Sequence, residues 1–216
     1  MPLLTQPAGP GAFRTLAPLV LASASPRRRE LLGSLGLGFS IDPGEAEEPR
    51  PEPGEAPADY ALRAARAKAL PVAAAHPEAV ILAADTIVVL DQDILGKPRD
   101  FADACAMLAR LSGRIHQVVT GCCLVRPQGG EKCFAVSSDV TMRRSHQAEL
   151  AAYAATGEPL DKAGAYAIQG LGGFLVRRVE GSYTNVVGLP LSRVLEVLLE
   201  WAVAAPRPGT PDRAAG

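Results

Sequence analysis

Residues 80–90 have the sequence VILAADTIVVL, an apolar run that only Asp85 and Thr86 interrupt. Such a run is typical of a long buried strand in an α/β protein. A carboxylate in the middle of that strand is costly to bury unless it is paired, hydrogen-bonded or bound to a metal. Asp85 is therefore a candidate general base or metal ligand. The alternative is that the run forms two strands with a break at Asp85, whose side chain then caps a turn.

Predicted strands and helices alternate on both sides of this run. Before it, the sequence patterns predict strands at 16–22 and 39–41 and helices at 26–35 and 59–75. After it, they predict strands at 118–125, 133–142 and 174–179, helices at 100–112, 145–156 and 190–203, and turns at 92–93 and 181–184. The first two of those strands should form an antiparallel hairpin. A strand–helix–strand order followed by a hairpin predicts an α/β fold with a mixed sheet.

Length and composition limit the classes of protein. The chain has 216 residues, 48% of them hydrophobic and 21% charged, which is enough apolar material for a sizeable core. A formal net charge of −1 gives no overall basic field for nucleic acid or an acidic membrane, and an aromatic content of 5% argues against base stacking. No stretch reaches the roughly eighteen apolar residues of a membrane span, so a soluble, cytoplasmic protein is expected.

The two ends of the chain are rich in Pro, Gly and Ala. This composition is typical of frayed termini. It predicts a flexible extension at 1–15 and a flexible tail at 206–216. The domain between them, 16–205, is expected to be a single one with two lobes.

The segment 23–29, SASPRRR, is a candidate anion site. Ser25 is placed to cap the predicted helix at 26–35, and Pro26 occupies its first position. The free N–H groups and positive dipole end of a helix attract anions, and arginine side chains bind phosphate oxygens in pairs. The alternative is an ordinary capped helix whose arginines are solvated.

Four further segments contain residues that could contact a ligand. The acidic, proline-broken stretch 42–57 includes Glu47 and Glu48, and its length suggests a functional loop or lid. Lys68 lies on the helix predicted at 59–75, and Lys97 follows the 80–90 strand within GKPRD. Residues 161–170, DKAGAYAIQG, are punctuated by glycine and end near Gln169, whose amide could recognise the edge of a base. Each has an ordinary alternative: solvated lysines and acidic residues, and a loop that needs glycine for its backbone angles.

The four cysteines are Cys105, Cys122, Cys123 and Cys133. They have no zinc-like spacing with one another or with histidine. Cys122 and Cys123 should point to opposite faces of a strand, so both cannot meet Cys133. We expect all four to be reduced.

Several of these segments together resemble the Maf family of nucleoside triphosphate pyrophosphatases. The matching stretches lie in the family's order and spacing: LASASPRRRELL at 21–32, ARAKAL at 65–70, AADTIVVLDQDILGKPRD at 83–100, ARLSG at 109–113, VVTG at 118–121, GEPLDKAGAYAIQGLGG at 157–173 and EGSYTNVVGLPL at 180–191. Only the terminal tails fall outside the resemblance.

The resemblance implies hydrolysis of the α–β phosphoanhydride of a nucleoside triphosphate, with a house-cleaning role in the nucleotide pool. It also implies a divalent cation (Mg²⁺ or Mn²⁺), a homodimer, and an elongated mixed sheet flanked by helices in two lobes around a central cleft. Asp85 falls on the family's proton acceptor. The positions that the family uses for phosphate, metal or substrate correspond to Ser23, Arg28, Glu48, Lys68, Lys97 and Gln169. Glu48 and Asp85 would hold the metal, and Glu47 is an alternative to Glu48.

Substrate choice also follows from the resemblance. The subfamily that acts on dTTP and UTP has Arg, Thr and Gln at the positions of Arg27, Thr86 and Gln169, whereas the 7-methyl-GTP subfamily tends to have Trp at the first and Glu at the last. The chain matches the pyrimidine pattern at all three. The rival readings are a purine or 7-methyl-GTP pyrophosphatase, a non-catalytic nucleotide-binding regulator of septum formation, and a simple anion-binding scaffold.

Overall fold

The computed structural model describes residues 4–47 and 49–208. Ten strands are present in these residues: β1 (Leu4–Gln6), β2 (Phe13–Thr15), β3 (Leu19–Leu21), β4 (Phe39–Ile41), β5 (Val80–Leu90), β6 (Asp93–Leu95), β7 (Ile115–Val125), β8 (Glu131–Met142), β9 (Val176–Glu180) and β10 (Ala204–Pro206). The α-helices are α1 (Pro26–Ser34), α2 (Pro57–Ala75), α3 (Phe101–Leu111), α4 (Gln147–Ala154), α5 (Tyr183–Val187) and α6 (Leu191–Glu200). Three 3₁₀ turns, η1 (Glu158–Asp161), η2 (Ala163–Ala165) and η3 (Leu171–Leu175), lie between α4 and β9.

The sheet is mixed, as predicted. Its order is β1-β4-β3-β5-β7-β8-β9, with β6 beside the far end of β5. The strand β3 is parallel to β4 and β5, and the remaining pairs in this sheet are antiparallel. The fold class expected from the sequence is therefore confirmed.

The run 80–90 is one unbroken strand, so Asp85 does not mark a break. One edge of β5 pairs with β7 from Ile81 to Val89. The other edge pairs with β3 at residues 80–82 and with β6 at residues 88–90. Between those two partners, residues 83–87 face no strand on that edge within the described chain, and this gap positions the candidate site.

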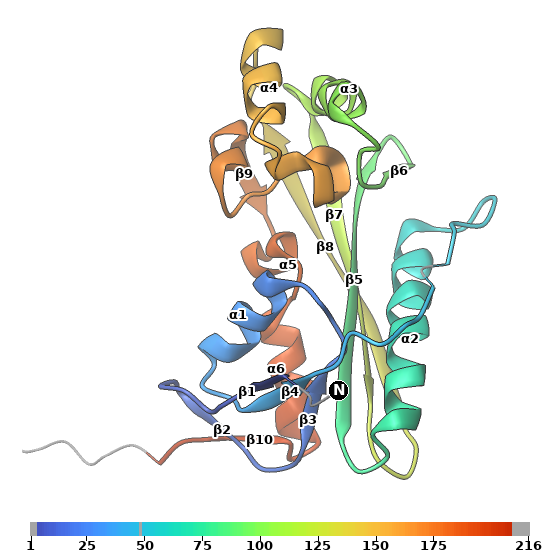
Figure 1. The fold of residues 1–216 in the computed structure, drawn as a ribbon, viewed down its shortest axis with the longest axis vertical. Coiled ribbons are helices and arrows are strands. Elements are labelled where there is room, and N and C mark those ends of the chain that lie inside the picture. Colours follow the sequence, from blue (N-terminus) through green and yellow to red (C-terminus); the bar gives the residue numbers. More distant parts are fainter. Residues whose placement is uncertain (1–3, 48, 209–216) are drawn as a thin grey trace, which may run out of the picture.

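The molecule is elongated because β5, β7 and β8 run along most of its length (Figure 1). Near one end, α1 and α6 lie on one side of these strands and α2 on the other, while α3, α4 and β9 gather at the opposite end (Figure 1). Each end has its own core. Leu21, Leu82 and Leu198 are fully buried at the first, and Leu108 and Leu175 at the second.

The N-terminal segment differs from the expected flexible extension at 1–15. Strand β1 pairs with β4 in the main sheet, and β2 pairs with β10 in a two-stranded sheet. Arg207 also donates hydrogen bonds to the carbonyls of Gly9, Phe13 and Gly36. Backbone pairing with distant segments, which composition does not reveal, orders residues 4–15. Residues 1–3 and 209–216, the outer parts of the two predicted tails, lie outside the described residues.

Three smaller expectations need correction. Helix α4 begins at Gln147, two residues after the predicted start at 145, and the N–H of the preceding His146 bonds the Glu149 carboxylate at 2.7 Å. The turn predicted at 181–184 leads directly into α5, which begins at Tyr183 because the Ser182 hydroxyl accepts from Asn185 N–H. The closing helix ends at Glu200, three residues before the predicted end.

The cysteines are not all reduced. Cys123 lies directly opposite Cys133 in the β7–β8 register, and the two form a disulfide with their Cα atoms 4.2 Å apart. Cys122 points to the other face, as the alternation of a strand requires, and is free and buried. The described helices include none that is long and apolar enough to cross a bilayer.

Candidate active site

A cleft of about 710 Å³ lies at the gap along the edge of β5. Residues from both ends of the molecule line it. The end that contains α1 contributes Arg27, Arg28 and Gly188, and the opposite end contributes Lys97 and Gln169. This size is typical of a small-molecule site. The two-lobed arrangement around a cleft that the sequence resemblance implied is therefore present.

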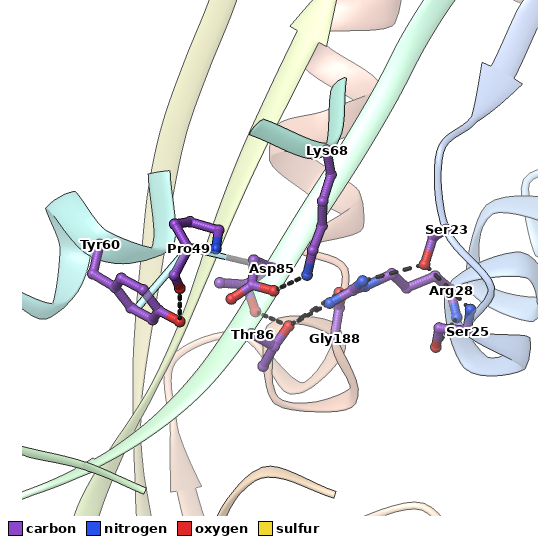
Figure 2. Close-up of polar contacts among 10 residues, drawn as sticks. Ser23, Ser25, Arg28, Pro49, Tyr60, Lys68, Asp85, Thr86 and Gly188 are labelled. Carbon is purple, nitrogen blue, oxygen red and sulfur yellow. Dashed lines mark hydrogen bonds and ion pairs between the residues drawn. The ribbon is translucent and has the colours of Figure 1, made fainter. Parts of the chain in front are cut away.

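Asp85 lies in the cleft and is only 4% exposed. It points to the α2 face of the sheet, where the Lys68 ammonium bonds Asp85 Oδ1 (Figure 2). Its second oxygen, Oδ2, is buried and has no hydrogen-bond partner within the described residues. A buried carboxylate oxygen without a donor is costly, and a proton, a water molecule or a cation would satisfy it.

Arg28 has a fixed orientation at the first turn of α1. Its Nε donates to the Gly188 carbonyl at 2.8 Å, and its two terminal nitrogens donate to Ser23 Oγ at 3.2 Å and to Thr86 Oγ1 at 3.0 Å (Figure 2). Thr86 Oγ1 also bonds Thr120 Oγ1 at 2.9 Å. Each guanidinium nitrogen therefore has a partner, and the charge is held at the rim of the cleft in one geometry.

The helix cap expected from the sequence forms as predicted. Ser25 is the residue before α1, its side chain accepts from the Arg28 N–H, and Pro26 occupies the first turn. Ser23 Oγ accepts from Ser25 N–H at 3.2 Å in addition to its bond with Arg28. Ser23 therefore lies behind Arg28 and supports it, and it is not among the residues that line the cleft.

The cleft has an excess of positive charge. Among the residues that the structure describes, five cationic side chains line it, against three carboxylates. The cations are Arg27, Arg28, Lys68, Lys97 and Lys162, and the carboxylates are Asp85, Glu158 and Asp161. A protein with a net charge of −1 thus concentrates cations where a polyanion would bind.

The acidic loop lies against α2. The Tyr60 hydroxyl donates to the Pro49 carbonyl at 3.0 Å (Figure 2). Arg63 donates to the Arg50 carbonyl at 2.9 Å and forms a paired salt bridge with Glu55, which lowers the pKa of that carboxyl to about 2. These bonds fix the part of the loop that follows residue 48.

Most of the predicted site residues meet in this cleft. Those that line it are Arg27, Arg28, Lys68, Asp85, Thr86, Lys97 and Gln169. Glu48 lies outside the described residues, and Glu47 is exposed and does not line the cleft. Lys97 is exposed, and no contact between it and Asp85 is present in the described structure.

The sequence did not single out three cleft residues: Tyr60, Glu158 and Lys162. Lys162 was visible within DKAGAYAIQG, but nothing in that pattern separates it from its neighbours. Its ammonium bonds Asp161, and Lys162 together with the more distant Arg27 lowers the pKa of that carboxyl. Tyr60 and Glu158 form hydrogen bonds with backbone groups of irregular segments more than ten residues away. No sequence spacing predicts such bonds.

Comparison with known proteins adds an independent finding. The family model described as Maf-like protein matches residues 18–201. A protein of Nitratidesulfovibrio vulgaris named dTTP/UTP pyrophosphatase is 52% identical over 189 residues, which cover 88% of this chain and 90% of the relative. A protein of Myxococcus xanthus with the same name is 54% identical over 180 residues, covering 83% of this chain and 90% of the relative. A crystal structure of a nucleoside-triphosphatase (dITP/XTP pyrophosphatase) from Mycobacterium abscessus is more distant, with 19% identity and a TM-score of 0.39 over 85% of this chain and 94% of that one.

Proposed function

The chain belongs to the Maf-like protein family, and we propose that it is a pyrophosphatase that hydrolyses dTTP and UTP to the nucleoside monophosphate and pyrophosphate. Its relatives of about half-identical sequence have that name and match it over most of its length. The observation in the molecule that carries the proposal is the buried Asp85 carboxylate, with one oxygen lacking a donor among the described residues, in a cleft rich in cations.

Asp85 supplies the base. Lys68 holds Oδ1 and thereby fixes the carboxylate, which leaves Oδ2 to accept a proton from a water molecule beside it. The oxygen of that water forms a bond to the α-phosphorus. The bond between that phosphorus and the bridging oxygen breaks, and pyrophosphate leaves with the electron pair of that bond.

Arg28 and the lysines of the cleft bind the phosphates. Phosphoryl transfer depends mostly on positioning and on neutralising negative charge, for which fixed cations are suited. Ser23, Thr86 and Gly188 hold Arg28 from three directions, so the cation is already oriented before the substrate arrives. Lys68 lies beside Asp85, and Lys97 lines the cleft nearer α3.

The residues of the pyrimidine pattern have different positions in the cleft. Gln169 lies on the far side from α1, where its amide could recognise O4 and N3 of thymine or uracil. Arg27 lies close enough to Asp161 to affect that carboxyl electrostatically. Thr86 bonds Arg28 and Thr120, so its effect on the substrate passes through Arg28.

A divalent cation, Mg²⁺ or Mn²⁺, fits the donor set in part. Carboxylate oxygens are the ligands these ions prefer, and the partnerless, buried Asp85 Oδ2 is such an oxygen among the described residues. A carboxylate oxygen has two lone pairs, so Oδ2 could contact the ion with one and accept the water proton with the other. Asp85 would hold the ion, together with Glu48 from the acidic loop, because the alternative, Glu47, does not line the cleft. When bound, the ion would offset negative charge on the phosphates. A homodimer in the cytoplasm remains a prediction from the family resemblance.

Pyrophosphate release from dTTP, UTP, CTP, GTP and 7-methyl-GTP, with Mg²⁺ or Mn²⁺ and an EDTA control, tests the proposal. Metal-dependent release from dTTP and UTP is expected. Activity confined to the purine nucleotides would overturn the substrate assignment. Saturable nucleotide binding without release would favour the regulator.

Asp85→Asn tests the role of the base. We expect the variant to fold and to lose a factor of about 10² to 10⁴ in kcat for dTTP, because an amide cannot take the water proton. Glu131→Gln is a matched control, since it removes a carboxylate whose ion pair with Arg66 lies at the surface. The melting temperature should be within a few degrees of the wild type for both. Asp85→Asn activity within tenfold of the wild type would exclude this role.

A further inference from the structure

The side chain of Gln169 depends on its backbone for its position. The residue is exposed, lines the cleft, and makes no hydrogen bond with its amide to another residue in the described structure. It lies between Tyr166 and the turn η3, in a segment without regular secondary structure. Whatever fixes the backbone on both sides of Gln169 therefore decides where its amide lies before a base binds.

Glu158 bonds the chain directly after Gln169. Its Oε2 accepts from Leu171 N–H at 2.9 Å, and its Oε1 accepts from Gly172 N–H at 2.9 Å. Oε1 also accepts from the Tyr153 hydroxyl at 2.8 Å. That hydroxyl in turn accepts from Ala167 N–H at 3.2 Å, which lies before Gln169. One carboxylate and one phenol therefore hold the backbone on both sides of Gln169.

Residues 170 and 172 approach Glu158 and Tyr153 so closely that only glycine fits at either position. A Cβ on Gly170, whose φ is +140°, would lie 2.6 Å from Glu158 Oε2. A Cβ on Gly172 would lie 2.4 Å from the Tyr153 oxygen. The segment thus packs directly on these two side chains, and glycine permits the close approach.

The Glu158 carboxylate is ionised and accepts hydrogen bonds from this segment. Burial opposes its ionisation, but the hydrogen bonds from Leu171 N–H, Gly172 N–H and the Tyr153 hydroxyl outweigh burial and keep its pKa below the usual value. Tyr153 is 3% exposed and belongs to the core beside α4, so the support is anchored in a packed element. Both oxygens of Glu158 already accept from protein donors, unlike Asp85 Oδ2.

We propose that Glu158 is a positioning residue that, together with Tyr153, holds residues 167–172 in the conformation that presents the Gln169 amide to a pyrimidine base. This inference rests on the proposed function, because it assigns Gln169 to the base. The proposal explains why the Glu158 carboxylate lies in a cleft whose cations suit a polyanion. Glu158 acts on selectivity through the backbone and touches neither the phosphates nor the attacking water.

Glu158→Gln is the first test, because the amide keeps the shape of the side chain but presents an N–H group to one of the backbone N–H donors. Without any nucleotide, hydrogen exchange of the Leu171 and Gly172 amides should become about tenfold faster or more, in line with the loss of charged hydrogen bonds. Glu149→Gln is the matched control, since Glu149 also accepts from a backbone N–H but lies at the start of α4. Unchanged exchange at Leu171 and Gly172 would overturn the proposal whatever the protein hydrolyses.

The second test measures base selectivity in a double-mutant cycle with Gln169→Ala. The readout is the ratio of kcat/KM for dTTP to that for CTP, with the Kd ratio of the α,β-methylene analogues measured in parallel by calorimetry. Glu158→Gln alone should raise KM for dTTP about tenfold and reduce the ratio, with kcat nearly unchanged. In the Gln169→Ala background it should leave the ratio unchanged, because the residue through which it acts is gone.

Tyr153→Phe should have a weaker effect in the same direction, since Glu158 keeps its two backbone donors. An effect of Glu158→Gln on the ratio that persists without Gln169 would overturn the proposal. A kcat loss of about a hundredfold at unchanged KM would also overturn it, since that result indicates a catalytic role. Failure of the proposed function is distinguishable: the wild type would then release no pyrophosphate, while the exchange measurement would still report on Glu158.

Discussion

Asp85 and Thr86 are neighbours in β5, and their side chains point to opposite faces of the sheet. The alternation of a strand directs Asp85 toward α2, where it meets Lys68, and Thr86 toward α1, where it meets Arg28. One dipeptide thus contains the proposed base and orients Arg28, the proposed phosphate-binding cation. The open edge of β5 between β3 and β6 brings both faces within reach of one ligand.

Arg28→Lys should weaken substrate binding even though the substitution keeps the positive charge. Lysine cannot make the three directional bonds to Ser23, Thr86 and Gly188, so the cation would no longer be held in place. We expect KM for dTTP to rise about tenfold to a hundredfold, equivalent to about 1.4–2.8 kcal/mol. Steady-state kinetics on Arg28→Lys and on the exposed Arg29→Lys would measure this; an equal effect in both would contradict it.

His116 should make the stability of the fold depend on pH. It is 2% exposed, its Nε2 bonds the Tyr166 hydroxyl at 2.8 Å, and burial lowers its pKa to about 4 against an opposing effect of Asp139. The unfolded chain binds this proton near pH 6.5 and the native state only near pH 4. The free energy of unfolding should therefore fall as pH decreases from 6.5 toward 4, by about 3 kcal/mol in all.

Urea unfolding at pH 7.5, 6 and 5 would measure the dependence. In that window the carboxylates with lowered pKa, such as Glu149 and Glu158, stay ionised in the native state and are mostly ionised in the unfolded chain, where glutamate titrates at about 4.3. His116→Gln should flatten the decline, and the exposed His146→Gln should keep it. A slope that is the same in His116→Gln as in the wild type would mean that other groups are responsible.

At the level of elements, Gly121 of β7 sets how closely α2 approaches the sheet. It is opposite Asp85 in the β5–β7 register. A Cβ there would lie 2.3 Å from the Ala61 carbonyl oxygen and 2.7 Å from Leu62 N, which are backbone atoms of α2. Since α2 also contains Lys68, this close contact determines the distance between Lys68 and Asp85.

Gly121→Ala should therefore affect both stability and activity. Overpacking against the helix backbone should cost about 1–3 kcal/mol, which lowers Tm by roughly 2–12 °C. Activity should fall severalfold because α2 and Lys68 are displaced. Calorimetry and kinetics would test this, with Gly33→Ala as control, since its Cβ would have no neighbour nearer than 3.9 Å. Equal Tm values for Gly121→Ala and Gly33→Ala would contradict the expectation.

Much of the arrangement of elements could be predicted from local patterns. The apolar run at 80–90 predicted β5, and Ser25 with Pro26 predicted the start of α1. The same patterns failed where distant segments decide the structure. The pairing of β1 with β4 and the Cys123–Cys133 bond each depend on register or tertiary contacts.

The site was predictable to a similar extent. A buried carboxylate in an apolar strand and arginines at a helix start are local signals that pointed to Asp85 and Arg28. The partners that orient them are not local: Gly188 is 160 residues from Arg28, and Thr120 is 34 from Thr86. The hydrogen bonds from Glu158 to the Gln169 segment were also unpredictable. The Glu158 carboxylate accepts from backbone N–H groups, which every residue except proline has, so no residue type marks the partners.

At the level of the whole molecule, the two cores should unfold together. Strands β5, β7 and β8 belong to both ends, so neither core can separate without breaking the same ladders. A single cooperative transition is expected. Trp201, the one tryptophan in the sequence, packs against the core near α6, and a Trp201→Phe/Phe174→Trp variant would place the probe at the opposite end.

Each probe should report the same midpoint as far-UV circular dichroism of the same variant. Two separate transitions would show that the ends are independent. So would a tryptophan midpoint clearly below the circular-dichroism midpoint, in the wild type or in the Trp201→Phe/Phe174→Trp variant. The Cys123–Cys133 disulfide lies in the β7–β8 hairpin and cross-links two of the shared strands. The wild type and the variant should therefore each be measured with and without reductant.

The open edge of β5 also bears on how such an enzyme can diversify. In the proposed arrangement, the groups that bind phosphate are Arg28 of α1, Lys68 of α2 and Lys97 before α3. The base-facing amide of Gln169 and the side chains that support its backbone come from one contiguous stretch, 153–172. Substitutions confined to that stretch leave Asp85, Lys68 and Arg28 untouched. The part of the nucleotide preference that depends on Gln169 can therefore change within some twenty consecutive codons while the proposed hydrolytic residues are inherited unchanged. Arg27 and Thr86 of the pyrimidine pattern lie outside that stretch. Engineers of altered specificity have the same short target for a library.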